Sequence, residues 1–300
     1  MSKREAIARY AIIVKKLRKH PASFEEIAQS LEKESELQSY NFNISKRTFQ
    51  RDIKDICSLY NIDIQYNRSL KSYYIDSSDE KPEVSERILE TFDIFNAINI
   101  TDRLSQYILF EKRKSLGTEN LYGLLHAIKN NLHVTFTYEK FWEDSITERT
   151  AEPYALKEFK NRWYLMAKET GIDYLKCFGL DRISNLDITN KKFTPEKYLN
   201  AEEHFRYCFG IMVPEDDEEP QDVILSFHPE QGKYIKTLPL HDTQEILADD
   251  ENEILVKLTL CVTFDFIMEL LSFGEYMKVM QPLSLVKEIK EAHQRAVKRY

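Results

Sequence analysis

Residues 161–168 read Asn-Arg-Trp-Tyr-Leu-Met-Ala-Lys, and residues 177–183 read Cys-Phe-Gly-Leu-Asp-Arg-Ile. Both are short apolar runs bounded by charged residues, which is typical of strands in a small β domain. Strand-like runs cover 134–138, 149–156, 162–168, 174–178 and 181–189. Five short strands within about 60 residues predict a small closed β-barrel, with Gly171 in the turn between the third and fourth.

The N-terminal quarter has helical patterns instead. Apolar residues at helical spacing between residues 4 and 19 predict a first helix that ends at His20-Pro21. Ser23 and Glu26 form a capping-box pattern that opens a second helix. Ser45 caps a third, whose apolar side carries Phe49, Ile53, Ile56 and Leu59. Strand patterns at 62–66 and 72–75 predict a hairpin, so residues 1–76 have the order of a winged helix-turn-helix.

The third helix presents residue types that contact DNA. Arg suits guanine edges, Gln suits adenine, and Lys suits phosphate. The candidate DNA contacts are Ser45, Lys46, Arg47, Thr48, Gln50, Arg51 and Lys54, with Arg68 and Lys71 at the hairpin tip. The alternative is a surface helix whose cations pair with Asp52 and Asp55.

The run from Ser45 to Ile53, followed by Ile62-Asp-Ile and Tyr73-Tyr-Ile, also resembles the winged helix-turn-helix of DeoR-like bacterial regulators. The resemblance covers roughly residues 5–76. It implies a DNA-binding domain.

Charge and composition agree with this division. The chain has 300 residues and a net charge of −8, yet residues 1–75 hold 14 Lys/Arg against 9 Asp/Glu, a net of +5. A basic face on an acidic protein favours local contact with nucleic acid. The sequence has neither a run of about 18 apolar residues nor an N-terminal signal core, so we expect no membrane span and a cytoplasmic location. The four dispersed cysteines are expected to be buried thiols.

The rest of the chain divides into four segments. Residues 77–131 predict a helical linker, with one apolar stripe at 84–98 and another at 121–128. It could transmit a signal, act as a spacer or form a dimer surface. Residues 132–194 hold the predicted barrel, and 195–221 form a second linker that includes an acidic run. Residues 222–300 form a further unit.

Four segments of the predicted barrel resemble a known family. Phe136-Thr-Tyr138, Arg149 with Pro153, Trp163-Tyr164-Leu165 and Leu180-Asp181-Arg182-Ile183 occur in the order of the signature segments of the WYL domain. The resemblance covers residues 132–190 and implies an Sm-like barrel that senses a ligand in bacterial transcriptional regulators. In that family, a basic and aromatic surface is thought to accept nucleotides or nucleic-acid fragments.

Five residues are candidate ligand contacts. Tyr138, Tyr154 and Tyr164 offer aromatic faces and hydroxyls, while Arg149 and Arg182 offer guanidinium groups suited to phosphate. Strand alternation places Trp163 and Leu165 in the core and Tyr164 on the opposite face. Arg182 has an alternative role, because it could pair with Asp181 or with a buried carbonyl.

The C-terminal unit has the pattern of a ferredoxin-like sandwich. Strands at 222–228, 244–248, 254–261 and 276–280 alternate with helices at 229–236, 264–272 and from 283, which gives the order βαββαβ and a final helix. Residues 270–274 and 279–282 resemble the closing pattern of the C-terminal extension (WCX) domain that follows many WYL domains. The resemblance implies a dimerisation domain.

The fold class is therefore an α+β multidomain protein. No Gly-rich phosphate loop, HExxH or GxSxG motif occurs, so we expect no enzymatic activity, no cofactor and no metal. The hypothesis is a homodimeric transcriptional regulator, a repressor, that binds a double-stranded DNA operator and senses a nucleotide or oligonucleotide effector. The alternative is a nucleic-acid-binding or scaffolding protein whose barrel is an interaction module without effector control.

Overall fold

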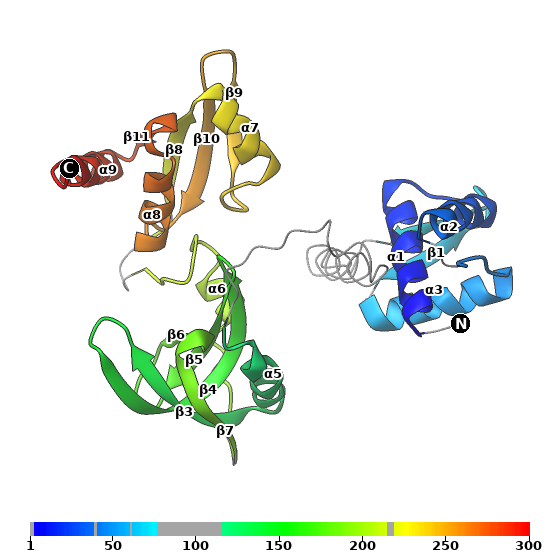
Figure 1. Cartoon of the computed structure of the whole chain (residues 1–300), viewed down its shortest axis with the longest axis horizontal. Helices are drawn as coiled ribbons and strands as arrows, with labels where there is room; N and C mark the ends of the chain where they lie inside the picture. Colours follow the sequence, from blue (N-terminus) through cyan, green and yellow to red (C-terminus); the bar gives the residue numbers. More distant parts are fainter. Residues whose placement is uncertain (1–2, 39–40, 61, 77–115, 215–218) are drawn as a thin grey trace. The chain divides into compact units, whose positions relative to one another are not determined.

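The computed structural model describes residues 3–38, 41–60, 62–76, 116–214 and 219–300. The chain divides into two compact units, residues 1–112 and 113–300 (Figure 1). The predicted apolar stripe at 84–98 lies outside the described residues, as does most of the acidic run. Within the described ranges, no helix is long and apolar enough to span a membrane.

The first unit contains the predicted three helices and hairpin. They are α1 (Lys3–Lys19), α2 (Phe24–Gln38), α3 (Lys46–Tyr60), β1 (Asp63–Asn67) and β2 (Ser72–Asp76). The capping box is present, because the Ser23 N–H donates to Glu26 Oε2 over 2.7 Å and the Glu26 N–H donates to Ser23 Oγ over 3.2 Å. Ser45 Oγ accepts the Thr48 N–H over 3.3 Å, which caps α3.

The core of the first unit forms where α3 meets α1 and the hairpin. Phe49 and Ile56 are fully buried and Ile53 is partly buried, as predicted. Leu59 is 58% exposed, so the prediction that it belongs to the apolar side was wrong. The apolar stripe stops short of this last turn, where Tyr60 is the buried residue.

A buried ion pair joins α1 to α3. The Arg9 guanidinium donates from Nε to Asp52 Oδ2 over 2.7 Å and from Nη2 to Asp52 Oδ1 over 2.9 Å, and both side chains have no exposed surface. The Tyr10 hydroxyl donates to Asp55 Oδ2 over 2.8 Å. Two-point contact fixes orientation as well as distance, so α3 is held against α1 in one rotational setting.

The second unit begins with a helix and a five-stranded sheet. The strands are β3 (Leu132–Lys140), β4 (Ser145–Phe159), β5 (Arg162–Glu169), β6 (Leu175–Gly179) and β7 (Ile183–Lys192), all paired antiparallel. Before them come η2 (Thr118–Asn120) and α5 (Leu121–Asn130), whose Leu124 and Ala127 are buried in the core of the sheet. The apolar residues at 121–128, which were predicted to belong to the linker, therefore lie on α5 and cover this sheet (Figure 1). Gly171 has φ +84° in the predicted turn.

The sheet is not closed into a barrel, so that prediction was wrong. The strand order is β6-β5-β4-β3-β7, and within residues 116–214 the edge strands β6 and β7 are not paired with each other. They are joined by the short 3-10 turn η3 (Leu180–Arg182). Closure depends on register and stagger, and here the β3–β7 pairing shifts register twice and the β4–β5 pairing shifts once, after Pro153.

A Gly117 turn anchors the start of this unit. Gly117 has φ +79°, and a Cβ at this position would lie 2.2 Å from the Leu180 carbonyl oxygen. Only glycine fits such a close approach of two backbone segments.

The C-terminal part follows the predicted element order. It comprises β8 (Gln221–Phe227), α7 (Pro229–Thr237), β9 (Glu245–Asp249), β10 (Ile254–Leu260), α8 (Phe264–Ser272), η4 (Gly274–Tyr276), β11 (Met277–Gln281) and α9 (Leu283–Val297). The four strands form an antiparallel sheet with order β11-β8-β10-β9. Its core includes residues of both α8 and α9.

The segment between the two sheets contacts both of them. It contains α6 (Ala201–His204), and the Phe209 ring lies 5.5 Å from the Phe159 ring of β4 and 5.6 Å from the Phe266 ring of α8. Asp265 Oδ2 accepts the N–H groups of Ile211 and Met212, each over 2.8 Å. Residues 209–212 are thereby fixed to the first turn of α8.

We expect the Arg9–Asp52 pair to dominate the stability of the first unit. Replacing Asp52 with Asn leaves a buried guanidinium without its anion, which should lower the free energy of unfolding by about 3–5 kcal/mol. Urea denaturation of the full chain, followed by circular dichroism, measures this. The Arg9→Met/Asp52→Leu double variant removes both charges and should recover most of the loss. Equal losses in the single and double variants would contradict this interpretation.

Candidate functional sites

The candidate DNA contacts on α3 lie on its outer side. Ser45, Lys46, Arg47, Gln50, Arg51 and Lys54 are exposed, and Thr48 is half-buried. Arg68 and Lys71 are exposed at the hairpin, where Lys71 has φ +50°. Asn67 Oδ1 accepts the N–H groups of Ser69 and Leu70, over 2.9 and 3.1 Å, which holds the tip in a defined turn.

The carboxylates of α3 do not neutralise this surface. Asp52 forms an ion pair with Arg9, and Asp55 accepts a hydrogen bond from the neutral Tyr10 hydroxyl, so both carboxylates face α1. Among the residues that the structure describes, none of the six Lys and Arg candidates on α3 and the hairpin forms an ion pair. The outer side of α3 is therefore a cationic surface on a fixed helix.

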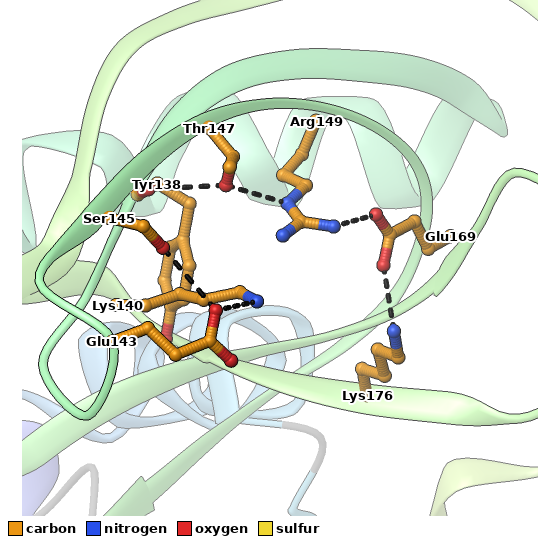
Figure 2. Close-up of polar contacts among 8 residues, drawn as sticks. All are labelled: Tyr138, Lys140, Glu143, Ser145, Thr147, Arg149, Glu169 and Lys176. Carbon is orange, nitrogen blue, oxygen red and sulfur yellow. Dashed lines mark hydrogen bonds and ion pairs between the residues drawn. The ribbon is translucent and has the colours of Figure 1, made fainter.

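A second candidate site is a pocket of about 370 Å³ in the second unit. Its polar lining residues are Tyr138, Lys140, Arg149, Glu169, Tyr174 and Lys176 (Figure 2 shows all but Tyr174). They come from β3, β4, β5, β6 and the loop before β6. Ile211 and Val213, from the segment after α6, complete one wall.

Glu169 forms ion pairs with two of the three cations that line the pocket. It accepts hydrogen bonds from Arg149 Nη1 and, over 2.9 Å, from Lys176 Nζ (Figure 2). Arg149 Nε also donates to Thr147 Oγ1 over 3.0 Å. Burial would raise the pKa of the Glu169 carboxyl, but the hydrogen bonds from Lys176 and Arg149 outweigh it and hold the pKa below its usual value.

The site has a surplus of positive charge. Lys140 Nζ lies 2.8 Å from Glu143 Oε2, so two carboxylates face three cations. Within the described part of the chain, Arg149 Nη2 has no hydrogen-bond partner. An anion such as phosphate fits this arrangement, because a guanidinium fork with free N–H groups binds such oxygens in a directed way.

Comparison with known families places this pocket in a known module. Residues 119–188 match the family model of the WYL domain, and residues 219–297 match that of the WCX domain. The chain contains a WYL domain and a WCX domain. The WYL match includes α5, in agreement with the packing of Leu124 and Ala127 in the core of the sheet.

The solved structures that are similar to this chain include the following two. Proteasome accessory factor B/C (PafBC) of Arthrobacter aurescens is 16% identical with a TM-score of 0.29, and the match covers 100% of this chain and 49% of that chain. A crystal structure of a CRISPR Cas-related protein is 12% identical with a TM-score of 0.40, covering 86% and 74% respectively. The present chain thus spans about half the length of PafBC. The comparison with curated proteins gave no match.

Two of the five predicted ligand contacts line the WYL pocket. They are Arg149 and Tyr138. Tyr138 is only 7% exposed, its ring packs 5.1 Å from that of Phe178, and its hydroxyl accepts the Gly179 N–H over 3.3 Å. Tyr138 therefore forms a rigid floor rather than an open stacking face.

The other two predicted tyrosines lie elsewhere in the WYL domain. Tyr164 is 7% exposed and does not line the pocket, so it has little surface to offer a ligand. The Tyr154 hydroxyl accepts the Glu196 N–H over 3.2 Å, and its ring lies 5.6 Å from that of Phe193. Both side chains are engaged in packing.

Arg182 lies beside the pocket without lining it. Its guanidinium carbon is 5.2 Å from the ring centre of Tyr138 and 5.2 Å from that of Phe141. Its Nε is buried without a hydrogen bond, 3.9 Å from Asp181 Oδ1, while Asp181 Oδ2 accepts from Arg162 over 2.6 Å. The Arg182 guanidinium thus lies close to both rings and is only loosely associated with Asp181.

Lys140, Glu169 and Lys176 line the pocket but were not predicted from the sequence. Lys140 continues the alternation of Phe136 and Tyr138 along β3, so this signal was present. Glu169 and Lys176 are brought together by the pairing of β5 with β6, in which Lys168 pairs with Leu175 and Ala167 with Lys176. That register could not be derived from the sequence.

The four cysteines are free thiols that differ in burial. Cys208 and Cys261 are buried and Cys177 is half-buried, but Cys57 is exposed, so the expectation of a buried thiol was wrong there. Burial raises the pKa of the Cys177 thiol to about 12 and that of Cys208 to about 11, so both stay protonated at neutral pH. In the described ranges, no three His, Cys, Asp or Glu side chains cluster in a way that could hold a metal.

Glu169 should make the stability of the WYL domain depend on pH. Because its folded pKa is lowered, its stabilising contribution is present above a pH of about 4.5 and is lost as pH falls through the folded pKa. We expect Glu169→Gln to destabilise the chain at pH 7 by about 1–3 kcal/mol. Urea denaturation at pH 7 and at about pH 3 should show this difference shrinking with acidity.

Glu148→Gln is the matched control, because Glu148 is exposed on the neighbouring strand β4. This variant should have little effect on the free energy of unfolding at either pH. A difference between Glu169→Gln and wild type that stays constant across this range would rule out the proposed role of the ionised Glu169 carboxylate.

Proposed function

We propose that this protein is a DNA-binding transcriptional regulator whose WYL domain binds a nucleotide or oligonucleotide that modulates DNA binding. The observation that carries the proposal is the cationic outer side of α3, whose own carboxylates are occupied by α1. In a winged helix-turn-helix, such a helix enters the major groove, while hairpin residues such as Arg68 and Lys71 contact phosphates.

The pocket of the WYL domain supports the effector role. Lys140, Arg149 and Lys176 surround a space of about 370 Å³, and only Glu169 among the polar lining residues carries negative charge. A nucleotide phosphate would bind the free N–H groups of Arg149 and compete with Glu169 for the others. Tyr138 and Arg149 remain our predicted contacts, and Tyr154 and Tyr164 are set aside because their side chains are packed.

The regulatory arrangement is a homodimer that represses transcription in a bacterium. Two recognition helices read a palindromic operator when they lie about 34 Å apart, or a multiple of that distance, along one face of the DNA. The WCX domain would supply the dimer contact. The effector acts only through different affinities for the two arrangements of the dimer.

The DNA-reading role of α3 is tested with Arg47→Ala and Arg51→Ala. Each should weaken binding of a duplex selected from a random pool by the wild-type protein. A base contact should cost about 1–3 kcal/mol, and a phosphate contact should reduce the salt slope by about one. Fluorescence anisotropy at several salt concentrations measures both quantities.

Lys129→Ala controls for the loss of one positive charge, because Lys129 is exposed on α5 in the other unit. This variant should bind DNA as the wild type does. Unchanged affinity and salt slope in both arginine variants would exclude α3 as the reading helix.

The effector role is tested by titrating the full chain with single-stranded hexathymidylate in a calorimeter. Arg149→Ala should weaken this binding about tenfold or more, because it removes charge-assisted hydrogen bonds. Lys129→Ala should not. Operator affinity should also change when the oligonucleotide is present; an oligonucleotide that binds without this effect would favour an interaction module without effector control.

A further inference from the structure

A groove of about 820 Å³ lies between β11 and α9 of the WCX domain. It shares no lining residue with the pocket of the WYL domain. Its volume falls within the range of about 300–1,000 Å³ that is typical of small-molecule sites. On the strand side, its floor is formed by Met277 and Val279, which belong to the apolar core of the domain.

The helix α9 contributes two rows of side chains to the opposite wall. Residues three or four positions apart lie on the same side of a helix. The first row is mainly apolar and consists of Val286, Ile289, His293 and Val297. The second row is polar and consists of Lys290, Gln294 and Lys298. The wall therefore changes from apolar at the floor to cationic at the rim.

The groove also changes in polarity along its length. Helix α9 begins one residue after β11 ends, and its lining residues continue from Val286 as far as Lys298, so the helix runs back beside the strand. The end where strand and helix are joined is lined by Val279, Val286 and Ile289. The far end has the charged residues Glu275 and Lys298. A ligand with one apolar end and one charged end matches this gradient.

The charge of the groove is mainly positive. Lys278, Lys290 and Lys298 line it, and Glu275 is the one carboxylate among its lining residues. In the ranges that the structure describes, none of these three lysines forms an ion pair. An anionic group would therefore find cationic donors that are not already engaged, and hydrogen bonds between ionised partners are stronger than neutral ones.

We propose that this groove binds a long-chain fatty acid, with the acyl chain on the apolar floor and the carboxylate beside Lys290 and Lys298. An acyl chain has no hydrogen-bonding group, so it can cover Val286 and Ile289 without leaving a polar group unpaired. The carboxylate lies at the rim, where both lysines are exposed. This site is separate from the proposed DNA-binding and effector roles and does not depend on them.

The groove is less suited to the same groove of a second copy. If two copies packed groove to groove, the row that contains Lys290 and Lys298 would face a surface that also carries these lysines. Like charges brought together across an interface weaken it. A fatty acid carries the opposite charge and therefore complements the rim.

The first experiment varies the ligand. Dodecanoate and tetradecanoate, each below its micelle concentration, are titrated into the full chain in a calorimeter. Each buried methylene is worth up to about fourfold in affinity, so two more should strengthen binding about 3- to 15-fold. Dodecyltrimethylammonium, which has the chain but a positive headgroup, should bind about tenfold more weakly than dodecanoate, or worse. Equal affinities for both chain lengths, or for both headgroups, would overturn the proposal.

The second experiment reverses one charge at the rim. Lys290→Glu should weaken dodecanoate binding about tenfold or more and strengthen binding of dodecyltrimethylammonium, because the headgroup now meets a carboxylate. A variant that merely failed to fold would not gain affinity for the cation. Lys233→Glu is the matched control, because Lys233 is exposed on α7 and does not line the groove. Equal effects of the two variants would show adventitious association and refute the site.

The third experiment fills the groove. Val286→Trp places a large ring on the floor and should abolish dodecanoate binding, with a thermal melt to verify that the half-buried position tolerates it. Val297 is 73% exposed, so Val297→Glu adds a carboxylate to the groove without altering the core and should also weaken binding. If Val297→Glu instead changes only the oligomeric state in sedimentation velocity, the groove is a protein contact and the fatty-acid site is refuted.

Discussion

The Arg9–Asp52 ion pair sets the orientation on which the first unit depends. Because the guanidinium contacts both carboxylate oxygens inside the core, α3 cannot rotate about its axis without breaking a buried charge pair. The same contact removes a negative charge from the surface of α3. One interaction thus decides both which side of the helix faces outward and the sign of the charge on that side.

Local patterns predicted the elements well, and long-range relations less well. The Ser23–Glu26 capping box and the βαββαβ order each depend on residues close in sequence, and both are present. Closure of the sheet depends on register between strands, which alternation does not contain. Arg9 and Asp52 are 43 residues apart in the sequence, so no local sequence pattern predicted that they form an ion pair.

The pocket of the WYL domain was predicted only in part, because local sequence patterns do not show which strands and segments pack together. Alternation predicted the strand that carries Tyr138, which lines the pocket, but it did not show that the second face of β5 is also covered. Met166 on that strand packs with Phe205 and Cys208 of the following segment, and Tyr164 is buried as well. A strand covered on both faces loses the polar side that an alternating pattern suggests.

The two hydrogen bonds at Asp265 connect one wall of the WYL pocket to α8. Ile211 and Val213 line the pocket, yet Ile211 and Met212 are fastened to the first turn of α8 in the WCX domain. An occupant bulky enough to displace that wall must either break these bonds or carry α8 with it. The pocket wall and the first turn of α8 are thus linked directly through the Asp265 carboxylate.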